Sequence, residues 1–105
     1  MGTYDAAVDL KRVDLNLLVA FDALMAERSV SAAADRLAVG QSAMSSTLAR
    51  LRKLINDPVL IREGRTMQAT PVAEALAEPV REALAQIEEM LSNTHRFDPA
   101  LDRRS

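Results

Sequence analysis

The stretch "SVSAAADRLAVGQSAMSSTLARLRKL", Ser29–Leu54, decides the fold. From Met44 to Ile55 the large apolar residues recur at spacings of four, three and four. That spacing predicts a helix that begins near Gln41 and buries one face. The alanine-rich segment before it predicts a shorter helix, capped by Ser31 and narrow enough to lie close to its neighbours. Two helices joined by a tight turn predict a helix-turn-helix.

The opposite face of the second helix carries small and cationic side chains. These are Ser42, Ser45, Ser46, Ala49, Arg50 and Lys53. Serine is an indifferent helix former, so a face that meets only solvent gains nothing from three of them. Small side chains let a helix sink into a groove, where hydroxyls can bond to base edges and cations to phosphates. The pattern therefore predicts that this helix reads double-stranded DNA.

The net charge of −2 hides an uneven distribution of charge along the chain. Between Arg28 and Arg65 there are seven basic and three acidic residues, a net charge of +4. Residues 1–27 hold two basic and five acidic groups and residues 66–105 hold four and seven, so each flank carries −3. A basic centre between acidic flanks is typical of a polyanion-binding surface, although many charge clusters only solvate a surface.

The flanking segments predict the rest of a small domain. "DLNLLVAFDALMAERS" predicts a helix before the pair, with Asp14 as its N-cap. Residues 56–58, "NDP", predict the end of the helix that begins near Gln41. "VLIRE" and "TMQAT", joined through Gly64 and Arg65, predict a hairpin with a basic tip.

A last, long helix is predicted after Thr70, the N-cap, and Pro71, the first helical residue. Its apolar stripe is wider than one seam needs, which favours packing on the domain with one edge and on a partner helix with the other. The candidate dimerisation residues are Leu76, Val80, Leu84, Ile87 and Leu91. The alternative is a monomer whose last helix only closes the core. Pro79 is expected to bend or split this helix, and the periodicity ends at Asn93.

Composition excludes several classes of function. The chain has 105 residues, enough for one domain, and 49% apolar but only 3% aromatic residues, which favours a mainly helical protein. It has no Cys and a single His95, so we expect no disulfide, no metal site and no cofactor. Without a glycine-rich phosphate loop or a catalytic cluster, an enzyme is not expected. The absence of a signal peptide or membrane-spanning run indicates a cytoplasmic protein.

The predicted order of elements is a winged helix-turn-helix followed by a long linker helix. Residues 13–100 resemble the DNA-binding domain and linker helix of LysR-type transcriptional regulators. The resemblance rests on "AAADRL", "QSAMS", "DPVLIRE", the arginine at the hairpin tip and the "TP" pair. "DLNLLVAFDALMAER", "GRTMQATP", "AEPVREAL" and "FDPA" are similar to the branch that holds the nodulation regulators of rhizobia and regulators of aromatic catabolism.

The resemblance implies roles for individual residues. Gln41 and the three serines would face the major groove, Arg50 and Arg52 the DNA backbone, and Arg65 the minor groove. The full set of candidate DNA-binding residues is Ser31, Gln41, Ser42, Ser45, Ser46, Arg50, Arg52, Lys53, Arg62 and Arg65. Two residues depart from the family pattern. Ser42 replaces a usual Pro, and Gly40 replaces a frequent capping Ser or Thr, so the start of this helix is expected to be looser.

The resemblance also implies a domain division and a set of partners. Residues 1–12 are expected to be a tail, 13–70 the winged helix-turn-helix, 71–93 the linker helix and 94–105 the start of an effector domain that the chain lacks. The expected partners are an interrupted palindromic operator and a second copy of the chain, with a tetramer as an alternative at full length. A small-molecule inducer would bind only to that effector domain. A helical protein-binding module without DNA is the rival interpretation.

Overall fold

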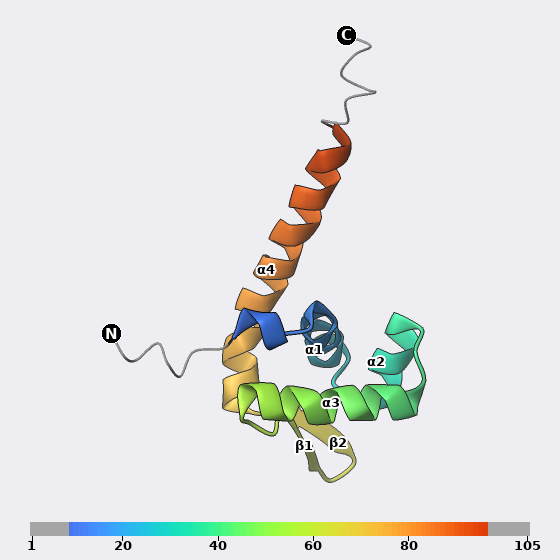
Figure 1. Cartoon of the computed structure of the whole chain (residues 1–105). Coiled ribbons are helices and arrows are strands. Elements are labelled where there is room, and N and C mark those ends of the chain that lie inside the picture. Colours follow the sequence, from blue (N-terminus) through green and yellow to red (C-terminus); the bar gives the residue numbers. More distant parts are fainter. Residues whose placement is uncertain (1–8, 97–105) are drawn as a thin grey trace, which may run out of the picture.

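The computed structural model describes residues 9–96, so most of both predicted tails lies outside the described residues (Figure 1). One turn of 3-10 helix, η2, is followed by four α-helices and a two-stranded antiparallel sheet. The bounds are η2 (Leu10–Arg12), α1 (Leu15–Glu27), α2 (Val30–Leu37), α3 (Gln41–Ile55), β1 (Leu60–Glu63), β2 (Thr66–Ala69) and α4 (Pro71–Arg96). The prediction of a mainly helical chain with a small hairpin and a long last helix is confirmed.

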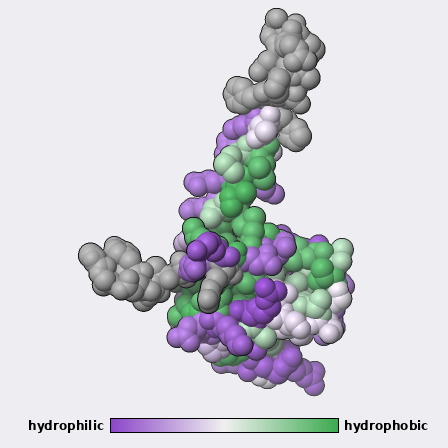
Figure 2. Space-filling model, in the orientation of Figure 1, coloured by the Kyte–Doolittle hydropathy of each residue, from purple (hydrophilic) through white to green (hydrophobic). Residues whose placement is uncertain are grey.

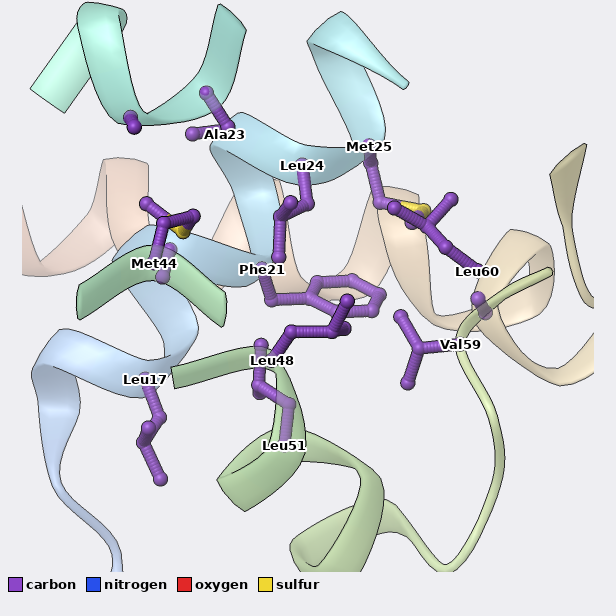
Figure 3. Close-up of a cluster of buried hydrophobic side chains, with 14 residues drawn as sticks. Leu17, Phe21, Ala23, Leu24, Met25, Met44, Leu48, Leu51, Val59 and Leu60 are labelled. Atoms are coloured by element: carbon purple, nitrogen blue, oxygen red, sulfur yellow. The ribbon is translucent and has the colours of Figure 1, made fainter. Parts of the chain in front are cut away.

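The core forms around Phe21, which lies between α3, the entry to β1 and the rest of α1 (Figure 3). Helix α1 packs against α2, α3 and α4, and α2 packs against α3. The fully buried large side chains are Phe21, Leu24, Met44, Leu51, Val59 and Leu60. Burial of such side chains contributes about 1.5–3 kcal/mol each, which is the main stabilisation of so small a domain. The predicted apolar stripes of α1 and α3 both face this core.

The helix-turn-helix forms as predicted, except at the start of α2. Its N-cap is Ser29, whose Oγ accepts a hydrogen bond from the Ala32 backbone N–H at 3.1 Å. The prediction that Ser31 caps this helix is therefore wrong. Ser31 lies in the first turn, with its hydroxyl 3.2 Å from that of Ser29. Two serines two residues apart offer the same local signal, and the partly buried Val30 packs against the core from inside the helix.

The other predicted boundaries are confirmed by their caps. The Asp14 carboxylate accepts from the Asn16 N–H at 2.9 Å at the start of α1. Helix α3 ends at Asn56, which adopts the left-handed conformation with φ of 59°. The hairpin pairs Leu60 with Ala69 through Glu63 with Thr66, and Gly64 turns with φ of +65°. We call this hairpin, residues 60–69, the wing.

Helix α4 begins at Pro71 and projects away from the domain (Figure 1). It is one continuous helix through Pro79, so of the two outcomes predicted there, a bend or a split, the split does not occur. Pro79 has no N–H to donate to the Ala75 carbonyl, and its ring crowds that carbonyl, but the helix-forming alanines and glutamates around it compensate and the helix continues. The helix also continues to Arg96, three residues past the end of its apolar periodicity. No helix within residues 9–96 is long and apolar enough to cross a membrane.

Candidate nucleic-acid interface

The exposed face of α3 carries hydrogen-bonding side chains that bond to no other described residue. Gln41, Ser42, Ser45 and Ser46, which we call the recognition face, are all exposed, whereas Met44, Leu48 and Leu51 on the opposite side are buried. Within residues 9–96 none of the four side chains of the recognition face makes a hydrogen bond. Their amide and hydroxyl groups are thus free to bond to another molecule.

The first turn of α3 lacks a side-chain cap. Gly40 is the N-cap, with φ of −72° and ψ of 153°, and makes no side-chain capping bond. The next three backbone N–H groups, of residues 41–43, have no partner inside the helix because the helical pattern begins only four residues on. The start of the recognition face therefore presents unpaired N–H groups at the positive end of the helix dipole.

The three cations of α3 differ in their surroundings. The Arg50 guanidinium is 3.9 Å from the Asp14 carboxylate, with both side chains largely exposed. Lys53 is exposed and has no ion pair among the described residues. Arg52 donates from Nε to the Pro58 carbonyl at 2.7 Å and from Nη2 to the Leu60 carbonyl at 2.9 Å. The sequence grouped Arg52 with the backbone-contacting residues, but its guanidinium already holds the start of the wing.

A cleft of about 510 Å³ separates the wing from the start of α2 and α3. It gathers four of the sequence-predicted residues, Ser31, Gln41, Arg62 and Arg65. Both arginines are exposed, and neither has an ion pair among the described residues. Among the described residues, Arg62 thus forms no ion pair with an acidic neighbour such as Glu63. The cleft combines two free guanidinium groups with hydroxyl and amide donors, a combination suited to a phosphate backbone.

The apolar stripe of α4 changes its surroundings along the helix. Leu76 and Val80 are partly buried and pack against the core. Beyond them the stripe continues on the projecting part, where Leu84 and Ile87 are half-buried and Leu91 is 58% exposed. Figure 2 shows this stripe as hydrophobic surface that continues along the projecting helix. The N-terminal part of the stripe thus packs on the domain and the C-terminal part does not. The sequence predicted instead that one edge of the stripe along the whole helix would pack on the domain and the other on a partner.

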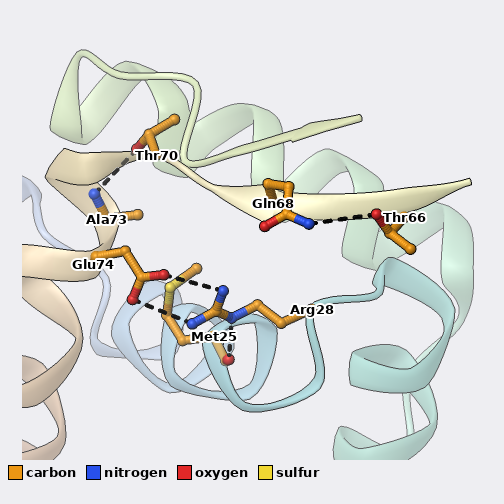
Figure 4. A network of polar contacts seen from close by, with 7 residues as sticks. All are labelled: Met25, Arg28, Thr66, Gln68, Thr70, Ala73 and Glu74. Carbon is orange, nitrogen blue, oxygen red and sulfur yellow. Dashed lines mark hydrogen bonds and ion pairs between the residues drawn. The ribbon is translucent and has the colours of Figure 1, made fainter. Parts of the chain in front are cut away.

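Sequence reasoning missed one contact that ties α4 to the helix-turn-helix. The Arg28 guanidinium forms an ion pair with Glu74 at 3.2 Å and donates from Nε to the Met25 carbonyl at 2.8 Å (Figure 4). Arg28 lies at the end of α1 in the left-handed conformation. The two partners are 46 residues apart, so no local pattern could have paired them.

Comparison with known proteins places the chain in a family. Residues 15–74 match the family described as "Bacterial regulatory helix-turn-helix protein, lysR family". The chain is 50% identical over 94 residues to Nodulation protein D 1 of Bradyrhizobium elkanii, covering 90% of this chain and 30% of that protein. It is 42% identical over 98 residues to the HTH-type transcriptional activator NagR of a Ralstonia species, covering 93% and 33%. The chain thus spans about a third of the length of these relatives.

Solved structures show the same arrangement. A probable transcriptional regulator from Pseudomonas aeruginosa aligns with a TM-score of 0.73 and 48% identity, over 78% of this chain and 28% of that one. The DNA-binding domain of BenM in complex with catB site 1 DNA aligns with a TM-score of 0.75 and 27% identity, over 81% and 96%. The matched residues, 15–74, run from α1 to the first turn of α4 and so contain the whole helix-turn-helix and wing. The chain belongs to the lysR family of bacterial regulatory helix-turn-helix proteins.

Proposed function

We propose that this chain is the sequence-specific DNA-binding part of a LysR-type transcriptional regulator and binds its operator as a dimer. The observation that carries the proposal is the recognition face of α3, which is exposed and makes no side-chain hydrogen bond to any described residue. It lies beside a cleft whose Arg62 and Arg65 have no ion pair with the described part of the chain. The alignment with a BenM domain solved on DNA supports the same use of the fold.

The contacts divide by chemistry. Gln41 can bond to an adenine edge with both atoms of its amide, and Ser42, Ser45 and Ser46 can bond to base edges or phosphates at close range. Arg50 and Lys53 would meet the backbone beside the groove, and Arg62, Arg65 and Ser31 the backbone or minor groove at the cleft. Arg52 would lie close to the DNA backbone, with two of its N–H donors already bonded to the carbonyls of Pro58 and Leu60.

Dimerisation is proposed through the projecting part of α4. Leu84, Ile87 and Leu91 would bury their apolar surface against the same helix of a second copy, with Leu76 and Val80 continuing the seam toward the domain. Two recognition faces related by a two-fold axis fit an interrupted palindrome. If the full-length protein has an effector domain after α4, that domain would bind the inducer, and the whole protein would form dimers or tetramers.

As a bacterial regulator the protein would act in the cytoplasm, on the nucleoid, without catalysis. The lysR family match and the names of the relatives, a nodulation protein and a transcriptional activator, support regulation rather than an enzymatic role. A protein-binding module is the alternative, and salt separates the two. Binding through several phosphates falls steeply as salt rises, whereas docking of apolar surfaces changes little.

The test uses a duplex selected from a random-sequence library by the chain itself. Its affinity is measured by fluorescence anisotropy between 50 and 200 mM salt, beside sedimentation of the free protein. Ile87→Glu should give monomers and weak operator binding, because a charge in the seam opposes burial. Gln86→Glu adds the same charge at an exposed position and should leave both unchanged. A wild-type chain that stays monomeric at tens of micromolar refutes the dimer, and a flat salt dependence refutes DNA binding.

A further inference from the structure

Helix α3, the two strands of the wing and helix α4 meet at one place, residues 56–60 and 70–73, which we call the junction. The junction contains the end of α3, both ends of the wing and the start of α4. At its centre Val59 has φ of 69°, and the Leu60 N–H donates to the Pro58 carbonyl at 2.7 Å. This is a γ-turn of the rare, strained hand. A β-branched residue at positive φ costs free energy and persists only where its surroundings impose it.

Two side chains that precede the turn and one backbone N–H beyond the wing hold this turn in place. Arg52 of α3 donates to the carbonyls of Pro58 and Leu60, which flank Val59 on both sides. The Asp57 Oδ2 accepts from the Val59 N–H at 2.8 Å. The Val59 carbonyl in turn accepts from the Thr70 N–H at 3.0 Å, and the Val59 side chain is fully buried. The backbone N–H and carbonyl groups of the turn, from the Pro58 carbonyl to the Leu60 carbonyl, are thus all hydrogen-bonded, which keeps the turn in this conformation.

The same carboxylate reaches α4. Asp57 Oδ2 also accepts from the Thr70 hydroxyl at 2.5 Å. The Thr70 Oγ1 in turn accepts from the Ala73 N–H at 3.1 Å, a bond that Figure 4 shows. Thr70 is 7% exposed and Ala73 is fully buried. An unbroken path of hydrogen bonds therefore leads from Arg52 on α3, through the turn, to the first turn of α4.

We propose that Asp57, Thr70 and Arg52 are positioning residues that set the orientation of α4 and the wing relative to α3, and thereby the half-site spacing that the dimer accepts. The proposal rests on the proposed dimeric binding of DNA. Since α4 carries the dimer contact and α3 the recognition face, the angle between them determines the distance and rotation between two recognition faces. Helix α4 otherwise meets the domain through apolar contacts and the exposed Arg28–Glu74 pair, which tolerate sliding and rotation more readily than directional bonds do.

The spacing test uses the selected duplex and versions with one or two base pairs inserted between the half-sites. Each inserted base pair rotates one half-site by about 35° and moves it by about 3.4 Å. The wild-type chain should lose at least about tenfold in affinity per insertion. Thr70→Val keeps the shape of the side chain but removes both bonds of its hydroxyl, and should bind all three duplexes within about threefold of one another. Thr70→Ser keeps the hydroxyl and should restore the wild-type ratio.

A general loss of stability would weaken binding to all three duplexes equally and leave the ratio unchanged, which would overturn the proposal. Asp57→Ala, which removes the acceptor of the Val59 N–H and of the Thr70 hydroxyl, is measured beside Thr70→Val and should also bind the three duplexes alike. A single variant that does not fold at the assay temperature then does not decide the result. A wild-type chain that itself ignores the spacer refutes the dimeric binding mode rather than the role of the junction.

The wing is tested by combining substitutions. If Arg52 acts by holding the wing, Arg52→Ala should remove most of the effect of Arg65→Ala, and the losses of the double variant should be far from additive. Lys53→Ala, the neighbouring cation without an internal partner, is the matched control and should add to Arg65→Ala. Additive losses for Arg52 and Arg65 would show that Arg52 contacts DNA directly and would overturn its positioning role.

Discussion

The two ends of α3 differ in whether their polar side chains are hydrogen-bonded within the protein. At the N-terminal end, the four side chains of the recognition face bond to nothing within the described residues, and Gly40 supplies no cap. At the C-terminal end, the side chains of Arg52, Asp57 and Thr70 are all hydrogen-bonded within the protein, to the turn at Val59 and to the start of α4. Under the proposed function, the first end is free to contact DNA, and the second holds α4 and the wing in the orientation in which that contact is made.

The strongest test of the free end is Ser45→Glu. A carboxylate placed in the groove faces phosphates and base acceptors at close range, so affinity should fall by more than about a hundredfold on every DNA sequence. The melting temperature should not change, because Ser45 is exposed and has no hydrogen bond to lose. Ser45→Ala is the control and should cost only about 0.5–1.5 kcal/mol. A folded Ser45→Glu protein with wild-type affinity would mean that α3 is not the reading helix.

The strongest test of the bonded end is Asp57→Ala. It leaves the Val59 N–H and the Thr70 hydroxyl without their acceptor, which should lower the free energy of unfolding by about 2–3 kcal/mol. Urea denaturation of the free protein measures this. Asp35→Ala on the exposed surface of α2 should change stability by less than about 0.5 kcal/mol. Equal stability of the two variants would remove the distinction between the two ends.

Gln41→Ala sharpens the comparison within the free end. Its amide is the only side chain of the recognition face that can bond to one base with two atoms, so its loss should cost about 1–3 kcal/mol of discrimination between the selected duplex and a scrambled one. Competition binding with both duplexes measures that difference, and thermal melting serves as the control for folding. If both affinities fall equally, Gln41 contacts the backbone and not a base.

The smallest expected effect comes from giving the free end a cap. Gly40 has ordinary backbone angles, and a Cβ added there would meet no atom within 4 Å. Gly40→Ser should therefore stabilise the domain by a few tenths of a kcal/mol through a bond to the first turn of α3. Thermal melting would show this as a small rise, and Gly64→Ser at φ of +65° should instead lower the melting temperature. A fall for both variants would show that Gly40 is needed for a reason beyond capping.

Local patterns in the sequence determined most of the fold and the recognition face. The four-three-four spacing of α3 depends only on the geometry of a helix, so it predicted both the buried stripe and the exposed serines opposite. Asp14, the "NDP" stop, Gly64 and the "TP" pair act on the backbone within a few residues of themselves, and their structures agree with the predictions. The prediction of Ser31 as the N-cap of α2 was wrong because Ser29, two residues earlier, gives the same local signal.

Tertiary structure alone decided which polar residues are free and which are engaged. Arg52 and Lys53 are neighbours in the sequence and read alike as cations, yet a turn of 100° between them aims one at the wing and leaves the other in solvent. Asp57 reads as a helix stop, but its second partner, Thr70, is 13 residues away on the far side of the wing. Hydrogen bonds across such distances depend on how the elements pack, and no spacing rule in a single sequence encodes them.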